Sequence, residues 1–125
     1  MSSLHTRLFT LFFLAYLMSC KEGTDERHQM IAGTWYLKNA QADGTETRRL
    51  DGTIFTFADG QINTNVPQIG AGAYHFEKNK LVQKGDSKIT YTIEALDNDA
   101  LILSMTLRDI DFRMEFVRDE PAAEN

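Results

Sequence analysis

Between Ile31 and Arg118, apolar and polar residues alternate with a period of two rather than 3.6. Residues 89–95, 101–107 and 110–116 show the alternation most clearly, because nearly every second position is apolar and most positions between are polar. Such a pattern is typical of antiparallel strands that have one buried face and one solvated face. Outside the N-terminal region the pattern predicts no long helix, only a possible turn at residues 25–30.

Short turn motifs separate the apolar runs. Asp43-Gly44 and Asp59-Gly60 are two-residue hairpin signals, because aspartate and glycine tolerate the positive φ that such turns need. A looser connection is expected at 67–72, and further turns are expected at 78–79, 84–86, 97–99 and 108–109. The sequence therefore predicts about eight strands in sequential order.

The length of each turn predicts which residues pair across the strands. Three two-residue turns predict the pairs Phe57–Ile62, Phe76–Leu81, Met105–Phe112, Leu103–Met114 and Leu101–Phe116. A three-residue loop at 97–99 predicts Ala95–Leu101, Ile93–Leu103 and Tyr91–Met105. The Asp43-Gly44 turn predicts the pairs Leu37–Leu50 and Trp35–Gly52. In a continuous strand from Leu50, however, Ile54 would point to the buried face and Phe55 to the solvent, although both are apolar. A bulge near Asp51-Gly52 would reconcile them.

We predict an all-β fold in which an eight-stranded antiparallel up-and-down meander closes into a small barrel, with an open meander or a sandwich as the alternatives. The side chains expected to point inward are large: Trp35, Leu37, Phe55, Phe57, Tyr74, Phe76, Tyr91, Ile93, Leu103, Met105, Phe112 and Met114. They could fill the barrel or leave room for one small ligand. The expected inward polar groups are Thr64, Gln83 and the hydroxyls of Tyr74 and Tyr91.

The N-terminal segment has the pattern of a secretory signal peptide: Arg7 precedes an apolar run at 8–18 that is too short to span a bilayer. It leads into Leu17-Met18-Ser19-Cys20, which resembles the bacterial lipobox. The resemblance implies that the chain is cut before Cys20 and that this cysteine carries lipid. Cys20 is the chain's single cysteine, so an internal disulfide is excluded.

Two other interpretations of this segment are open. Cys20 could follow an ordinary cleaved signal by chance, or residues 8–18 could form a buried helix. The charged residues 21–27 predict a flexible tether, and they also resemble the surface-export signal of Bacteroidetes lipoproteins. We expect four segments: a lipoprotein signal peptide at 1–19, a tether at 20–29, a barrel domain at 30–119 and a polar tail at 120–125. The exported protein would be lipid-anchored in the cell membrane or the outer membrane.

The motif Gly33-Thr34-Trp35 on the first strand resembles the opening of lipocalins and related calycins. The order of turns and aromatic strands over residues 30–118 is similar to the small lipocalin-like domains of Bacteroidetes lipoproteins. The resemblance implies a lipocalin-like barrel in which Trp35 packs across the closed end. It further implies that a basic residue near the end of the last strand, Arg118 rather than Arg113, lies over Trp35. The chain is shorter than full-length lipocalins and has no clear C-terminal helix, so the cavity should be small.

Charge and composition exclude several functions. A net charge of -5 and the lack of a basic run longer than Arg48-Arg49 argue against nucleic-acid binding. His28 falls in the expected tether and His75 should face outward, so no catalytic constellation is recognisable and we expect no enzyme. The pairs Asp97–Asp99 and Asp109–Asp111 sit in expected turns and do not form a dense oxygen-ligand loop. We expect no metal and no cofactor.

We therefore expect a lipid-anchored protein of the cell envelope that binds a small apolar ligand. The expected ligand-binding residues are Trp35, Phe55, Phe57, Tyr74, Tyr91, Met105 and Phe112. The alternative is a packed β-module that contacts an envelope protein and has no small-molecule ligand. Of its outward face, only Ile102 and Tyr36 stand out from the sequence, too few to define a patch.

Overall fold

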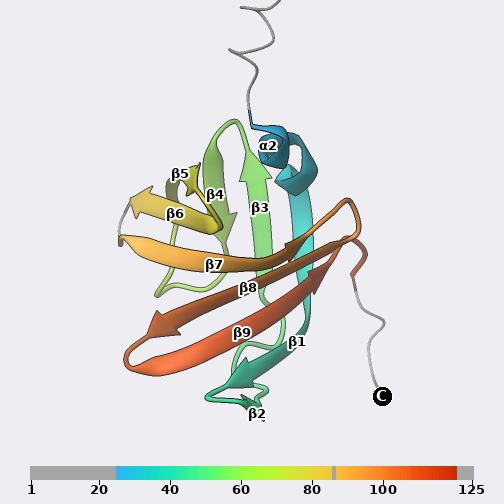
Figure 1. Ribbon diagram of the computed structural model, residues 1–125. Helices are drawn as coiled ribbons and strands as arrows, with labels where there is room; N and C mark the ends of the chain where they lie inside the picture. The colour runs from blue at the N-terminus through green and yellow to red at the C-terminus, as the bar shows by residue number, and fades with distance from the viewer. Residues whose placement is uncertain (1–24, 86, 121–125) are drawn as a thin grey trace, which may run out of the picture.

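The computed structural model describes residues 25–85 and 87–120. Figure 1 shows a short helix lying against one end of a strongly curved sheet. The helix is α2 (Glu26–Ile31). The strands are β1 (Gly33–Ala42), β2 (Thr45–Glu46), β3 (Ile54–Ala58), β4 (Gln61–Thr64), β5 (Gly72–Glu77), β6 (Lys80–Gly85), β7 (Ile89–Leu96), β8 (Ala100–Leu107) and β9 (Ile110–Val117). Cys20, the expected signal peptide and residues 121–125 of the expected tail lie outside the described residues.

The strands form one antiparallel sheet that closes on itself. Its order is β2-β1-β3-β4-β5-β6-β7-β8-β9, and β1 also pairs with β9 from Tyr36–Val117 to Ala42–Phe112. The two-residue strand β2 pairs only with the end of β1 and lies outside the closed ring. The predicted all-β meander closing into an eight-stranded barrel is therefore confirmed, and the open meander and the sandwich are not formed.

The registers predicted from three two-residue turns are confirmed. Phe57 pairs with Ile62, Phe76 with Leu81, and Leu103 with Met114. The turn between β8 and β9 has Arg108 at φ 53° and Asp109 at φ 67°. Two consecutive positive φ values give a turn whose twist matches that of the flanking strands, and such a turn admits one register.

Two predicted registers need correction. Ile93 pairs with Leu103 as expected, but a shift between Ile93 and Ala95 places Ala95 opposite Ile102 rather than Leu101. The Asp43-Gly44 turn does form, yet its hairpin ends after two pairs, and Trp35 pairs with Phe55 rather than Gly52.

The reason for the second error is that residues 47–53 leave the sheet. Backbone hydrogen bonds from Asp51 to Arg48 and from Thr53 to Leu50 fold them into consecutive turns. The expected bulge near Asp51-Gly52 is thus a whole loop. It lets β3 enter with Phe55 facing inward, where Phe55 is 0% exposed.

The turn at Asp59-Gly60, the turn at Lys78-Asn79 and the loop at Asp97–Asp99 lie at the same end of the barrel as helix α2. Arg27 of the helix donates a hydrogen bond to the carbonyl of Lys78, and Arg118 donates one to the carbonyl of Asn98. We call this the closed end. The loops 47–53 and 65–71 and the turn at 108–109 lie at the opposite end, which we call the open end.

Helix α2 begins within the expected tether, of which it covers residues 26–29, and ends in the expected barrel domain at Ile31. Asp25 caps it, because its carboxylate accepts a hydrogen bond from the Arg27 backbone N–H at 3.0 Å. Its last residue, Ile31, is buried in the core. His28 packs against the rings of Tyr74 and Phe76, with ring centroids at 5.4 and 4.8 Å. The helix is therefore part of the folded domain.

Within the described residues, no helix is long and apolar enough to cross a bilayer.

Candidate functional site

The closed end is sealed by Trp35. Its side chain is 0% exposed, and its indole N–H donates to the carbonyl of Ile31 at 2.8 Å. The guanidinium carbon of Arg118 lies 3.6 Å from the centre of the Trp35 ring. This contact combines a cation–π attraction with the exclusion of water from the ring. The roles that the lipocalin resemblance implied for Trp35 and Arg118 are therefore both present.

Arg118 also joins the helix to the barrel. Its guanidinium donates to the carbonyl of Ala32 at 2.8 Å and to the carbonyl of Met30. Gly33 makes this possible, because it has φ +112° and a Cβ there would lie only 3.0 Å from the guanidinium. The approach of Arg118 thus explains why the Gly-x-Trp motif has a glycine at position 33. Because Arg118 covers the Trp35 ring, the closed end offers no room for a ligand next to it.

Aromatic side chains occupy the barrel interior above Trp35. The Phe55 ring packs on Phe116 at 4.8 Å and on Tyr91 at 6.0 Å between centroids. Phe57 meets Tyr74 edge-on at 5.4 Å. Offset and edge-to-face contacts at these distances are the favourable arrangements of aromatic rings. The expectation that large inward side chains pack together is therefore met here.

The polar groups of the interior satisfy one another. The hydroxyl of Tyr91 donates to the side-chain carbonyl of Gln83 at 3.2 Å, and the amide of Gln83 donates to the backbone carbonyl of Ile69 at 2.9 Å. Burial raises the pKa of Tyr91. The loop 65–71 thus dips into the barrel, and its Ile69 is 1% exposed. Thr64, also expected to face inward, is half-buried and accepts a hydrogen bond from the Val66 backbone.

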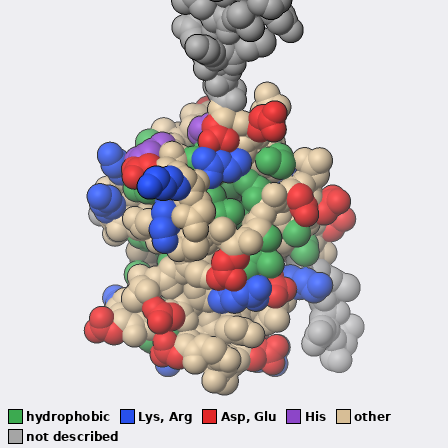
Figure 2. Space-filling model, viewed as in Figure 1, with side chains coloured by type: hydrophobic (Ala, Val, Ile, Leu, Met, Phe, Trp, Pro, Cys, Tyr) green, Lys and Arg blue, Asp and Glu red, His purple; other side chains and the backbone are tan. Residues whose placement is uncertain are grey.

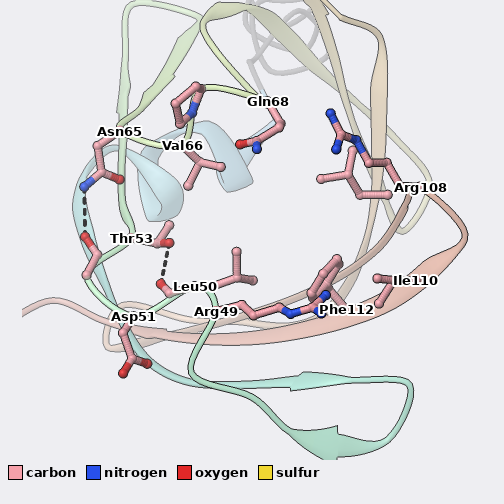
Figure 3. Close-up of a pocket in the computed structure, with 13 residues that line it drawn as sticks. Arg49, Leu50, Asp51, Thr53, Asn65, Val66, Gln68, Arg108, Ile110 and Phe112 are labelled. Carbon is pink, nitrogen blue, oxygen red and sulfur yellow. Dashed lines mark hydrogen bonds between the residues drawn. The ribbon is translucent and has the colours of Figure 1, made fainter.

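A pocket of about 360 Å³ lies at the open end, above this packed interior. Figure 3 shows its walls, which come from three separate segments. The loop before β3 contributes residues 49–53, the loop between β4 and β5 contributes residues 65–68, and the β8–β9 hairpin contributes residues 107, 108, 110 and 112. Its apolar lining consists of Leu50, Val66, Pro67, Leu107, Ile110 and Phe112.

Hydrogen bonds hold the pocket's loops in place. The Asn65 side chain accepts from the backbone N–H of Ile54 at 2.9 Å and donates to the carbonyl of Gly52 at 2.8 Å. It therefore ties one loop to the other. The hydroxyl of Thr53 donates to the carbonyl of Leu50 at 2.6 Å. These bonds make the opening pre-formed, which is usual for small-molecule sites.

Side-chain direction divides the lining into an apolar centre and a charged rim. In Figure 3, Leu50 and Val66 point towards the middle of the pocket, whereas the carboxylate of Asp51 points away from it. Asp51 instead accepts a hydrogen bond from Arg48 at 3.1 Å. Arg49 and Arg108 supply the positive charges of the lining.

Phe112 is the one residue of the seven expected ligand contacts that lines this pocket. The other six, Trp35, Phe55, Phe57, Tyr74, Tyr91 and Met105, lie in the packed core and are at most 7% exposed. Direct contact of those six with a ligand stays a prediction that the pocket does not support. Sequence reasoning missed the remaining lining residues, because most of them belong to irregular loops that periodicity does not describe.

The residues considered for catalysis lie apart from the pocket. The imidazole of His75 contacts the carboxylate of Glu77 at 2.5 Å on the barrel's outside, and His28 lies on the closed-end helix. The Asp97 carboxylate accepts from the backbone N–H groups of Asp99 and Ala100, as expected of a turn residue. Within residues 25–85 and 87–120, no three histidine, cysteine or acidic side chains gather as metal ligands would.

Comparisons with known proteins support the fold. No family model and no curated protein matches the chain. A solved structure of a lipocalin-like protein from Bacteroides uniformis is similar, with a TM-score of 0.53 and 18% sequence identity. The match covers 71% of this chain and 98% of the other. At this identity the likeness concerns the fold, and with the closed antiparallel barrel it shows that the chain has a lipocalin-like fold.

Proposed function

We propose that this protein is a lipid-anchored lipoprotein of the cell envelope that binds a small, largely apolar ligand in the open-end pocket. The observation that carries the binding part is the pocket itself, about 360 Å³ with an apolar centre and hydrogen-bonded loops. Pockets of about 300–1,000 Å³ with few polar groups are typical of small-molecule sites. The volume is near the lower limit, so the ligand is a compact one.

The packed interior sets how the ligand would bind. Phe55 packs on both Tyr91 and Phe116 in the interior, and Ile69 of the loop 65–71 is buried in the same core. A ligand would rest on Phe112 and the loop residues rather than descend to Trp35. The anchor part of the proposal rests on the lipobox-like tetrapeptide ending at Cys20.

A dye titration tests the binding site. N-phenyl-1-naphthylamine is a neutral apolar dye that fluoresces in apolar surroundings. Leu50→Trp should fill the pocket and weaken dye binding by at least about fivefold, a change of about 1 kcal/mol. Ile102→Trp places the same ring on the outward face of β8 and should leave binding unchanged. Circular dichroism confirms that both variants are folded.

The alternative, contact with an envelope protein, has one supporting observation. Outward Tyr36 of β1 pairs with Ile54 of β3 on one side and with Val117 of β9 on the other. All three side chains are half-exposed, so the outward face has more apolar residues together than the sequence revealed. On the face shown in Figure 2, hydrophobic side chains gather near the middle, with acidic and basic side chains interspersed around them. Dye binding that is lost in Ile102→Trp and kept in Leu50→Trp would favour this outer surface.

A further inference from the structure

On the rim of the pocket, two arginines have guanidinium groups that contact no partner among the described residues. Arg49 lies on the loop before β3, Arg108 lies in the β8–β9 turn, and both side chains are exposed at the lining. Within residues 25–85 and 87–120, no hydrogen bond or ion pair engages either guanidinium. The other described arginines are engaged: Arg27 with Asp25, Arg48 with Asp51, Arg113 with Glu94 and Glu115, and Arg118 with Trp35 and three carbonyls.

The charge around the pocket differs from that of the whole chain. The chain has a net charge of -5, yet the pocket lining has two arginines and one carboxylate. That carboxylate, Asp51, is neutralised by Arg48 and points away from the pocket. The lining therefore presents a net positive rim above apolar walls. A guanidinium binds an anionic group through its positive charge and its N–H donors, and the rim supplies two guanidinium groups.

The β8–β9 turn holds Arg108 at the rim of the pocket. The residue has φ 53° at the first position of this two-residue turn. Its side chain is exposed and lines the pocket, so its guanidinium is within reach of a ligand bound there.

We infer that the ligand is a compact amphipathic anion, whose apolar body rests against Leu50, Val66 and Phe112 and whose carboxylate is held by Arg49 and Arg108. This inference rests on the proposed ligand-binding function and narrows it. The exposed rim keeps the anionic group partly hydrated, so the charge selects among ligands while the apolar contact supplies most of the affinity.

The test compares octanoate with 1-octanol, which has the same alkyl body without the charge, by titration calorimetry on the full-length protein. The wild-type protein should bind octanoate more tightly than 1-octanol. Arg49→Gln and Arg108→Gln should each weaken octanoate binding by about three- to fivefold, and together by about tenfold. Binding of 1-octanol should change by less than about twofold. Lys38→Gln removes one positive charge from the outward face of β1 and is the matched control, with octanoate binding unchanged.

The outcomes separate the two proposals. If the wild-type protein binds octanoate and 1-octanol equally well, and Leu50→Trp loses both, the anion inference is overturned and the pocket remains an apolar site. Octanoate binding that is unaffected by both arginine substitutions, or equally weakened by Lys38→Gln, also overturns it. Binding of neither compound overturns both the inference and the proposed function. Raising salt from about 0.05 M to about 0.5 M should weaken octanoate binding only, because exposed charges are screened.

Discussion

Truncating the tryptophan at the closed end tests how this barrel is stabilised. Trp35 is fully buried, and Trp35→Ala removes its whole indole from the core. Replacing a buried tryptophan by alanine costs about 3–5 kcal/mol of unfolding free energy. We expect the upper part of that range, because the Ile31 carbonyl loses its donor and Arg118 loses the ring beneath it. Each of these losses adds to the cost of the cavity.

The assay is urea unfolding followed by circular dichroism, since Trp35 is the chain's only tryptophan and its fluorescence disappears with it. With a slope of about 1.5 kcal/mol per molar urea, a loss of 4 kcal/mol lowers the midpoint by about 2.7 M. Trp35→Phe is a milder substitution at the same position, and its loss of stability is compared with that of Trp35→Ala. It keeps a buried ring but removes the hydrogen bond to Ile31, so it should cost about 1–3 kcal/mol.

A loss below about 1 kcal/mol for Trp35→Ala would refute this reasoning, because such values are typical of surface positions. Equal losses in the alanine and phenylalanine variants would show that the hydrogen bond, rather than ring burial, carries the effect. If the alanine variant does not fold, which a domain of total stability about 5–15 kcal/mol could show, the phenylalanine variant still gives the test.

Three further predictions concern other parts of the chain. Cys20→Ser should leave an unlipidated or uncleaved precursor, seen by mass and by cell fractionation, and normal membrane retention of this variant would contradict the anchor. Gly72→Ala should destabilise the barrel by about 1–3 kcal/mol in urea unfolding, because the new Cβ would lie 2.3 Å from the Lys84 carbonyl oxygen; a loss under about 0.5 kcal/mol would mean that the strands do not approach so closely. Hydrogen bonds from Arg27 lower the pKa of Asp25 from 3.8 to about 2. A carboxyl group with a lowered pKa in the folded state stabilises the fold above about pH 4, and this contribution is lost as the pH falls towards 2. Asp25→Asn should therefore make the free energy of unfolding depend less on pH in that window. An unaltered acid profile would argue against the cap.

The order of the strands and most registers could be predicted from the sequence because their causes are local. A two-residue turn such as Arg108-Asp109 leaves a single register, and alternation then decides which side chains are buried. The shift at Ala95 could not be foreseen in this way. The hairpin closes more tightly than a loop at 97–99 requires, since Leu96 pairs with Leu101 and the Asp97 N–H donates to the Ala100 carbonyl. The extra residue of β7 is taken up between Ile93 and Ala95.

The Asp43-Gly44 hairpin shows where local reasoning fails. The turn is correct, but the strand after it is only two residues long, because the chain then folds into consecutive turns and leaves the sheet. The opposite edge of β1 pairs with β9 from Tyr36 to Ala42. Pairing across the closing seam of the barrel is non-local, so turn lengths near β1 carry no information about it. Residues 47–53 are then free to form the loop that lines the pocket.

The candidate site was harder to predict than the fold for the same reason. Period-two alternation identifies inward side chains, and those inward aromatics form the core rather than the pocket lining, apart from Phe112. Leu50, Val66 and Arg49 sit on loops whose path depends on hydrogen bonds such as those of Asn65. A leucine flanked by Arg49 and Asp51, next to the bulge expected at Asp51-Gly52, was the available sequence signal.

Chemical-shift mapping tests the central claim most directly, that ligands bind at the open end of the barrel. Octanoate would be titrated into isotopically labelled protein while backbone amide resonances are followed. The account predicts saturable shifts at residues 49–53, 65–68 and 107–112, and none around Tyr36, Ile54 and Val117. Shifts confined to the outward face of β1, β3 and β9, or no saturable shifts at all, would contradict it.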